Sequence, residues 1–157
     1  MVQTVKGWVA EPVWRLVKAS VPIACVDIIA SNHQDAVLLG WRVIHPYANV
    51  WATPGGRMRL GEGPVETAQR VLSYHGIRAN DFYLVGIFPI GFRSRFDVSI
   101  CLAATGISGS ATPDGTELTK MGWFRKLPKR TGKNYVRMVE KWRKIRASPE
   151  TVRLNQL

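Results

Sequence analysis

Cysteine is scarce in this 157-residue chain, which has only Cys25 and Cys101. Both lie in apolar, strand-like stretches, and neither has the spacing of a metal ligand. We therefore expect two buried, reduced thiols rather than a disulfide or a cysteine-bound metal.

Long hydrophobic runs are also absent. No apolar stretch approaches the length that crosses a membrane. The first 18 residues have no long apolar centre and no small-residue cleavage site, so no secretory signal is visible. We expect a cytoplasmic protein with no membrane partner. Apolar residues nevertheless make up 46% of the chain, which excludes disorder, and the length suits one domain with a sizeable core.

Acidic side chains are few: 11 Asp and Glu stand against 22 Lys and Arg, giving a net charge of +11. This balance favours polyanionic partners such as nucleic acid, nucleotide phosphates or an anionic surface. The excess is concentrated near the C-terminus, where only Glu140 and Glu150 oppose a run of bases after Met121.

The hydrophobic pattern predicts strands interleaved with helices. Helices are expected over residues 13–19, 64–75 and 134–146, and strands over 23–30, 36–43, 50–53, 82–88, 94–104 and 121–124. Strands 23–30 and 36–43 are expected to pair as a hairpin, and residues 106–115 to form a mobile loop. No repeat or linker divides the chain. The prediction is one α/β domain over residues 1–157, with a mixed β-sheet, a core at about 20–127 and a basic helical extension at about 128–157.

Residues 51–77, WATPGGRMRLGEGPVETAQRVLSYHGI, are the most informative segment. Gly56, Glu62 and Arg70 have the spacing of the first part of the Nudix box, G-x5-E-x7-R-E-U-x-E-E-x-G-U, where U is a bulky apolar residue. The segment therefore resembles that box. In the family, this loop and helix hold Mg²⁺ or Mn²⁺ against a diphosphate, and the box glutamates are the metal ligands.

The second part of the box departs from the family pattern. Val71 stands where the glutamate after the arginine is expected, and Tyr74 and His75 stand where the pair of glutamates is expected. One residue is also missing before Gly76. Magnesium prefers hard oxygen ligands, so His75 is a poor replacement and is expected to be a helix-end histidine rather than a metal ligand or base.

Within the Nudix family the chain most resembles the GDP-mannose mannosyl hydrolases, over about residues 11–124. The resemblance rests on Asp27 in the first strand, on LLGWR ending at Arg42, and on W-x-x-P-G-G-R ending at Arg57. It implies the Nudix fold, a mixed sheet sandwiched between helices. It further implies that Arg42 and Arg57 face the diphosphate, that Asp27 contacts the sugar, and that free sugar is released. Independently, Arg59 adds a third guanidinium near the glycine-rich loop, and such groups suit phosphate oxygens.

The metal and catalytic roles are predicted for the remaining acids. Glu62 and Glu66 are the candidate catalytic residues, and a weakly held or absent Mg²⁺ would be bound by the Gly56 carbonyl, Glu62 or Glu66, and Glu117. Arg70 is expected to pair with Glu62 and to anchor the loop.

Two functions remain open. The first is a Nudix hydrolase acting on a nucleoside diphosphate sugar or a related nucleotide. The second is a catalytically inactive Nudix-fold protein that binds RNA, as in a ribosome, through Arg137, Lys141 and Lys144 on the outer face of the last helix. A homodimer is compatible with either.

Overall fold

The computed structural model describes residues 9–148 and 151–154. The prediction that the first 18 residues form no secretory signal concerns residues 1–8 in part. The predicted basic extension includes residues 149–150 and 155–157. These parts lie outside the described residues.

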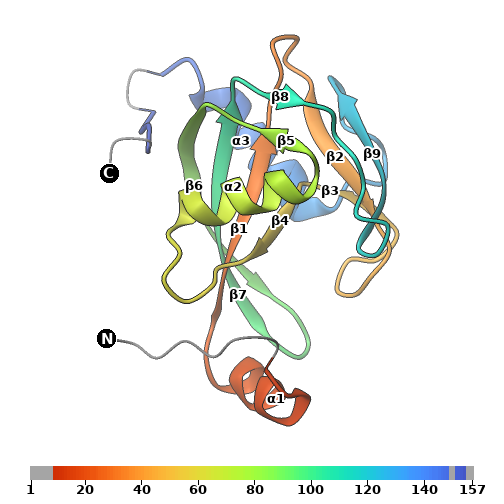
Figure 1. The fold of residues 1–157 in the computed structure, drawn as a ribbon, viewed down its shortest axis with the longest axis vertical. Helices are drawn as coiled ribbons and strands as arrows, with labels where there is room; N and C mark the ends of the chain where they lie inside the picture. Colours follow the sequence, from red (N-terminus) through yellow and green to blue (C-terminus); the bar gives the residue numbers. More distant parts are fainter. Residues whose placement is uncertain (1–8, 149–150, 155–157) are drawn as a thin grey trace.

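The central sheet has the strand order β4-β1-β7-β6 (Figure 1). Its strands are β1 (Ile23–Ala30), β4 (Gly55–Arg57), β6 (Asp81–Gly91) and β7 (Phe96–Thr105). β1 runs parallel to β7, whereas β1–β4 and β6–β7 are antiparallel. The sheet is therefore mixed, as predicted. The β-branched residues of β1 and the apolar run of β7 explain why these two strands lie at its centre.

A second sheet has the order β3-β2-β9, formed by β3 (Val50–Ala52), β2 (Val37–Arg42) and β9 (Leu118–Phe124). The predicted hairpin of residues 23–30 and 36–43 is therefore wrong. Only one bridge, Ser31 to Val37, joins the two segments before they separate into different sheets. β4 and β7 already occupy both edges of β1, so β2 pairs with β3 and β9 instead.

Helix α2 (Pro64–Tyr74) covers one face of the central sheet. Proline in its first turn favours the helical start, and the buried residues Ala68, Val71 and Leu72 recur at helical spacing. They pack against Val26 and Ile28 of β1. Side chains alternate along a strand, so the intervening residues of β1 face the opposite side.

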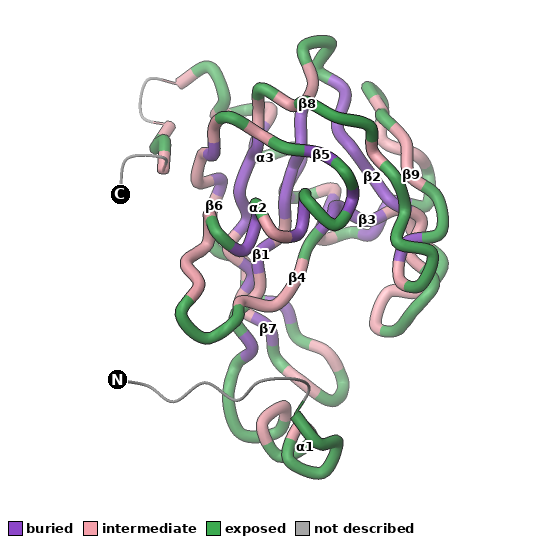
Figure 2. Tube along the Cα trace, in the orientation of Figure 1, coloured by how far each residue is buried: buried purple, intermediate pink, exposed green. Residues whose placement is uncertain are grey.

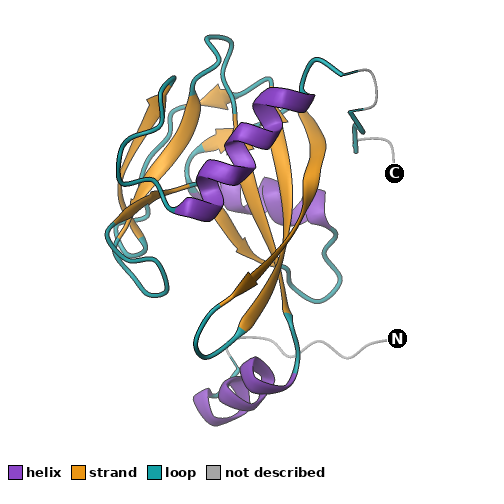
Figure 3. Cartoon of the chain, turned by 180° about the vertical axis from the view of Figure 1, so that it is seen from behind, coloured by secondary structure: helices purple, strands orange, loops and turns teal. Residues whose placement is uncertain are grey.

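Helix α3 (Lys133–Ile145) covers that opposite side, and from behind it lies across the strands (Figure 3). The predicted face is confirmed: Tyr135, Val139 and Trp142 are buried, and Ile145 packs against the same cluster. The domain is thus a mixed sheet between α2 and α3, and α3 is the basic C-terminal helix.

Helix α1 (Glu11–Ser20) differs from the other two because none of its residues is buried. It lies at the end of the molecule, beyond the tip of the β6–β7 hairpin (Figure 1). Figure 2 shows α1 as mostly exposed, whereas the centres of β1, β2 and β7 are buried. No helix in the described part of the chain is both long and apolar enough to span a membrane.

Residues 106–115 are not a free loop. They contain β8 (Ser108–Gly109), which pairs with β5 (Ile77–Arg78) just after α2. The backbone N–H of Thr112 also donates to the carbonyl of His75 at 3.0 Å. These hydrogen bonds fix the segment to the end of α2.

Candidate ligand-binding site

Polar side chains gather on the α3 side of the central sheet. Asp27 alternates with Val26 and Ile28, which pack against α2, so it faces the α3 side together with Ile29. In the parallel register Cys25 lies opposite Ser99, and in the antiparallel register it lies opposite Arg57. These residues come from three strands and share one face.

Asp27 is the carboxylate at the centre of this face. Ser99 Oγ donates a hydrogen bond of 2.5 Å to Asp27 Oδ2. Burial raises the pKa of Asp27 to about 6, although the hydrogen bond from Ser99 and the charge of Arg42 act in the opposite direction. A Cβ at Gly55 would lie 2.6 Å from Asp27 Oδ1, so the glycine gives the carboxylate its space.

Arg42 reaches the site from the end of β2 in the second sheet. Its Nε donates to the carbonyl of Pro46 at 3.0 Å, and its Nη1 forms an ion pair with Glu117. Burial lowers the pKa of Arg42, and the positive charge of Arg95 lowers it further. Arg42 is therefore a part-buried cation with a second cation as a neighbour.

Arg57 belongs to β4 and lies over the ring of Trp14 from α1, with its guanidinium carbon 4.2 Å from the ring centroid. Burial is again the main cause of a lowered pKa, followed by the charge of Arg95. Because the charge of Arg95 disfavours the protonated state of both Arg42 and Arg57, an anion placed beside them would be stabilised.

Arg95 and Asp97, at the start of β7, were not singled out from the sequence. Arg95 Nη2 donates to Asp97 Oδ2 at 2.8 Å, and Asp97 is only 5% exposed. Within the described part of the chain, the buried atoms Arg95 Nε and Asp97 Oδ1 have no hydrogen-bond partner. The sequence R-S-R-F-D-V-S at residues 93–99 indicates that Asp97 and Ser99 share one face of a strand. No local pattern connects this strand to residues 51–77.

Glu62 fixes the loop before α2 and forms the predicted ion pair with Arg70. Arg70 donates to both carboxylate oxygens at 2.7 Å, and Thr67 Oγ1 donates to Oε2 at 3.0 Å. The backbone N–H of Arg59 adds a bond of 3.1 Å, and Arg70 also donates to the Arg57 carbonyl. The Arg70 hydrogen bonds are the main cause that lowers the pKa of Glu62 to about 2. Glu62 therefore shapes the loop that carries Arg57 and Arg59.

The side chains at the later box positions do not fit the Mg²⁺ site that the family pattern implies. Val71 is buried in the core, and the exposed Tyr74 hydroxyl accepts a hydrogen bond from Arg59 at 3.1 Å. His75 is buried, with Nδ1 3.1 Å from the carbonyl oxygen of Thr112, which supports its interpretation as a helix-end histidine. None of the three positions carries a carboxylate, the ligand that Mg²⁺ prefers.

The predicted metal ligands are not brought together either. Glu62 is engaged by Arg70, and Glu117 is paired with Arg42. Glu66 is exposed, and its carboxylate folds back towards Gly63, where an added Cβ would lie 2.6 Å from Oε2. Across residues 9–148 and 151–154, no three His, Cys, Asp or Glu side chains cluster as a metal site. Gly56 belongs to β4 and pairs with Val26.

The predicted basic face of α3 is present. Arg137, Lys141 and Lys144 are exposed, and Lys141 Nζ lies 5.5 Å from the ring centroid of Phe88. Exposure alone is what an ordinary solvated helix face also shows.

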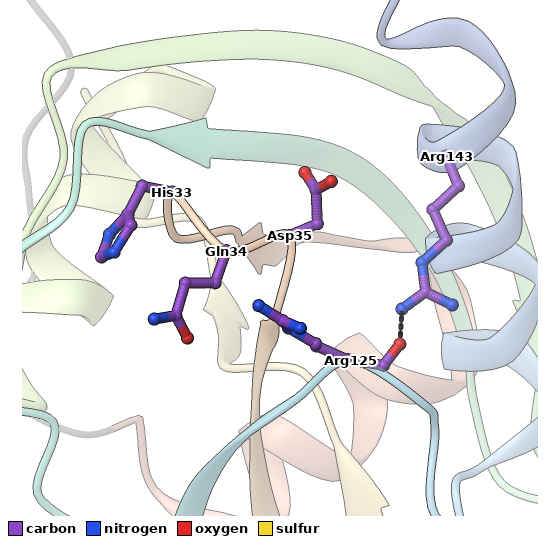
Figure 4. Close-up of a pocket in the computed structure, with 5 residues that line it drawn as sticks. All are labelled: His33, Gln34, Asp35, Arg125 and Arg143. Carbon is purple, nitrogen blue, oxygen red and sulfur yellow. Dashed lines mark hydrogen bonds between the residues drawn. The ribbon is translucent and has the colours of Figure 1, made fainter.

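A separate hollow of about 450 Å³ lies where the turn after β1 meets the end of β9 and α3. It is lined by His33, Gln34, Asp35, Arg125 and Arg143 (Figure 4). Two of its charged groups have partners: Arg143 donates to the backbone carbonyl of Arg125, and Asp35 forms an ion pair with Arg146. This hollow contains none of the predicted site residues.

Comparison with known proteins identifies the domain. A family model described as the NUDIX domain matches residues 21–125, well over half of the chain. The chain belongs to the Nudix family. Arg42, Arg57 and the box segment all lie within the matched range.

Solved structures show the same fold. The MutT NUDIX hydrolase of Burkholderia pseudomallei superposes with a TM-score of 0.72 at 19% identity, over 78% of this chain and 98% of that one. The NUDIX domain of Shewanella oneidensis NrtR, solved in complex with ADP ribose, superposes with a TM-score of 0.68 at 16% identity, over 87% of this chain and 98% of that one. At such identities the likeness concerns the fold.

One curated relative matches part of the sequence. The low-salt glycan biosynthesis protein Agl8 of Haloferax volcanii is 34% identical over 58 residues, which is 37% of this chain and 36% of that protein. The match thus spans about a third of the relative's length. None of these named relatives supports the RNA-binding alternative.

Proposed function

We propose that this Nudix domain recognises a nucleoside diphosphate sugar and releases its sugar. The observation that carries the proposal is that Arg57 shares the sheet face of Asp27, while the charge of Arg42 acts on Asp27 and the charge of Arg95 acts on both Arg42 and Arg57. Three guanidinium groups suit the oxygens of a diphosphate, whereas a carboxylate suits the hydroxyl groups of a sugar. The partial match to a glycan biosynthesis protein supports a ligand that carries a sugar.

The proposed binding mode places the diphosphate among the arginines. Arg42 and Arg57 are part-buried, so their charge is less screened than that of a surface side chain. Their lowered pKa values reflect burial and the positive charge of Arg95, and the charge of a bound anion would offset both costs. The Glu62–Arg70 pair holds the loop so that Arg57 and the exposed Arg59 project from it.

The proposed reaction is displacement at the anomeric carbon. Water attacks that carbon, the bond to the diphosphate oxygen breaks, and the nucleoside diphosphate leaves with the electron pair. The arginines stabilise the charge on the leaving group. Asp27, with a pKa raised by burial to about 6, is ionised at neutral pH and accepts the proton of the water. Of the two glutamates predicted to be catalytic, Glu62 is committed to Arg70 and Glu66 lies outside this face.

Binding calorimetry with a panel of nucleotide sugars tests the first part of the proposal. Arg42→Ala and Arg57→Ala should each weaken binding about tenfold or more, because a charge-assisted hydrogen bond contributes roughly 1.5–3 kcal/mol. Arg78→Ala, which removes an exposed arginine from β5, is the matched control and should leave affinity unchanged. Equal affinity in all four proteins would show that the arginines do not hold the ligand.

Product analysis tests the second part. Free sugar together with nucleoside diphosphate is the expected outcome, and it should be lost in Asp27→Asn but retained in Glu66→Gln. Nucleoside monophosphate with sugar phosphate would instead show cleavage within the diphosphate. Turnover in Asp27→Asn at the wild-type rate would remove Asp27 from the reaction.

A further inference from the structure

The segment between β2 and β3, residues 45–49, joins the second sheet to the central sheet and α3. We call it the strap. Two of its residues, Tyr47 and Asn49, have φ angles of 65° and 61°, in the left-handed region that is costly for a bulky residue such as tyrosine. Such a backbone persists only where surrounding contacts hold it. The strap is therefore a strained segment that its neighbours keep in place.

Tyr47 is the central side chain of the strap. Its ring packs edge-on against Phe92 at the tip of the β6–β7 hairpin and against Tyr135 of α3, with centroid distances of 5.3 Å and 6.1 Å. Its hydroxyl accepts a hydrogen bond of 2.6 Å from Asn134 Nδ2, also on α3. One side chain thus fastens the strap to both the hairpin and the helix.

The strap also engages Arg42. Arg42 Nε donates to the carbonyl of Pro46 in the strap at 3.0 Å, and Arg42 Nη1 pairs with Glu117. A phosphate that binds a guanidinium through two parallel hydrogen bonds uses either Nε with one Nη or both Nη nitrogens. Each of these pairs contains a nitrogen of Arg42 that already has a partner. A diphosphate must therefore displace one of the two protein acceptors before Arg42 can hold it in this way.

The aromatic contacts of Tyr47 extend to a second arginine. The guanidinium carbon of Arg95 lies 5.1 Å from the ring centroid of Phe92, the same ring against which Tyr47 packs. Arg42 and Arg95 both belong to the proposed diphosphate site, which together with Arg57 is here called the arginine site. The strap thus contacts one of its arginines directly and another through Phe92.

We propose that the strap closes the arginine site in the free protein and moves away when a diphosphate binds, with Tyr47 as the gate. The proposal rests on the proposed function, since it requires an anion at Arg42. Opening exchanges the neutral carbonyl of Pro46 for a charged phosphate oxygen, which makes a stronger hydrogen bond to Arg42, and it releases the strained backbone of Tyr47. These gains offset the lost contacts of Tyr47 with α3 and the hairpin, so the ligand favours the open state.

Calorimetry with inorganic pyrophosphate tests the gate. Asn134→Ala and Tyr47→Phe remove the same hydrogen bond from its two ends, which should shift the strap towards the open state by roughly twofold to tenfold. Because only the open state binds, pyrophosphate affinity should rise by the same factor in each variant and no further in the double variant. Tyr83→Phe is the matched control: it removes the hydroxyl of another part-buried tyrosine, whose ring stacks on Trp142, and should leave affinity unchanged.

Hydroxyl-radical labelling followed by mass spectrometry reports the position of the strap independently of affinity. Modification of Tyr47 should increase in Asn134→Ala without ligand, and it should also increase in the wild type when pyrophosphate is added. A ligand that covered a site already open would lower the modification of Tyr47 or leave it unchanged. Trp123, an exposed residue of β9, serves as the internal reference.

Tighter binding in both single variants, together with greater labelling of Tyr47, supports the gate. Unchanged or weaker pyrophosphate affinity in Asn134→Ala and Tyr47→Phe overturns it while the arginine site stands, and so does unchanged or lower labelling of Tyr47 when pyrophosphate binds. If pyrophosphate binds neither the wild type nor the variants, the proposed function fails together with the gate, because the arginines then hold no diphosphate.

Discussion

Asp27→Asn should separate the stability of this domain from its function. The substitution keeps an acceptor for the hydroxyl of Ser99 and almost the same volume, and it removes the charge. Burial raises the pKa of Asp27 from 3.8 to about 6 in the folded protein, so the ionised carboxylate destabilises the fold at neutral pH. Removing that charge should therefore increase the free energy of unfolding.

The size and the pH window of the effect follow from the pKa difference. A shift of about two units corresponds to roughly 3 kcal/mol, an upper figure because the residue is only part-buried by accessible surface. The folded state binds the proton more tightly than the unfolded state, so the cost of Asp27 is absent below about pH 4 and grows until about pH 6. Asp27→Asn should thus be more stable than the wild-type protein above about pH 6 and about equal to it below pH 4.

Urea unfolding followed by tryptophan fluorescence, repeated from about pH 4 to pH 8, measures this difference. Asp35→Asn is the control at an exposed carboxylate paired with Arg146, and it should change stability by less than about 1 kcal/mol. A difference between Asp27→Asn and the wild type that stays constant with pH would refute the reasoning. The same variant should lose ligand turnover, since residues that bind or react are often costly to the fold.

The remaining predictions concern the box and the arginine site. Glu62→Gln should be destabilised by about 1–2 kcal/mol at neutral pH, and the difference should shrink as pH falls from about 4.5 towards 2, because the pair with Arg70 lowers the pKa of Glu62. Thermal melts over that range would measure it, and a difference that does not change with pH would contradict it. The wild-type protein is expected to bind Mg²⁺ weakly, and the double variant Tyr74→Glu, His75→Glu should bind it more tightly. Micromolar Mg²⁺ affinity of the wild-type protein in calorimetry would contradict the first expectation. Arg57→Lys should weaken nucleotide binding although it keeps the charge, since lysine lacks the guanidinium fork, and equal affinity would show that charge alone suffices.

Most elements of the fold could be predicted because their signal is local. The predicted strand at residues 23–30 coincides with β1. The predicted helix at 64–75 is one residue longer than α2, and the one at 134–146 is shifted by one residue from α3. Apolar residues at the right period determine these segments. The pairing of β2 with β9 had no such signal, because it depends on which strand edges are already filled. β4 escaped prediction since Gly55 and Gly56 have no side-chain pattern.

The site could be predicted only where a motif or resemblance existed. Arg57 shares a sheet face with Asp27, and the charge of Arg42 acts on Asp27 from the second sheet; the ligand contacts that the resemblance implies for these residues stay predictions. Arg95 and Asp97 lie far along the chain and join them only because β7 pairs in parallel with β1. A parallel pair is not visible in sequence periodicity, so residues it brings together cannot be found from local pattern.

The box of this chain separates two roles that the family motif combines. Glu62 and Arg70 retain the hydrogen bonds that fix the loop, including the bond from Arg70 to the Arg57 carbonyl, whereas the later positions lack carboxylates. Loss of the loop pair would release Arg57 and so weaken the arginine site, but loss of the later carboxylates leaves the placement of Arg57 intact. The loop pair therefore accounts for how the proposed arginine site can keep the position of Arg57 although the later box positions carry no carboxylate.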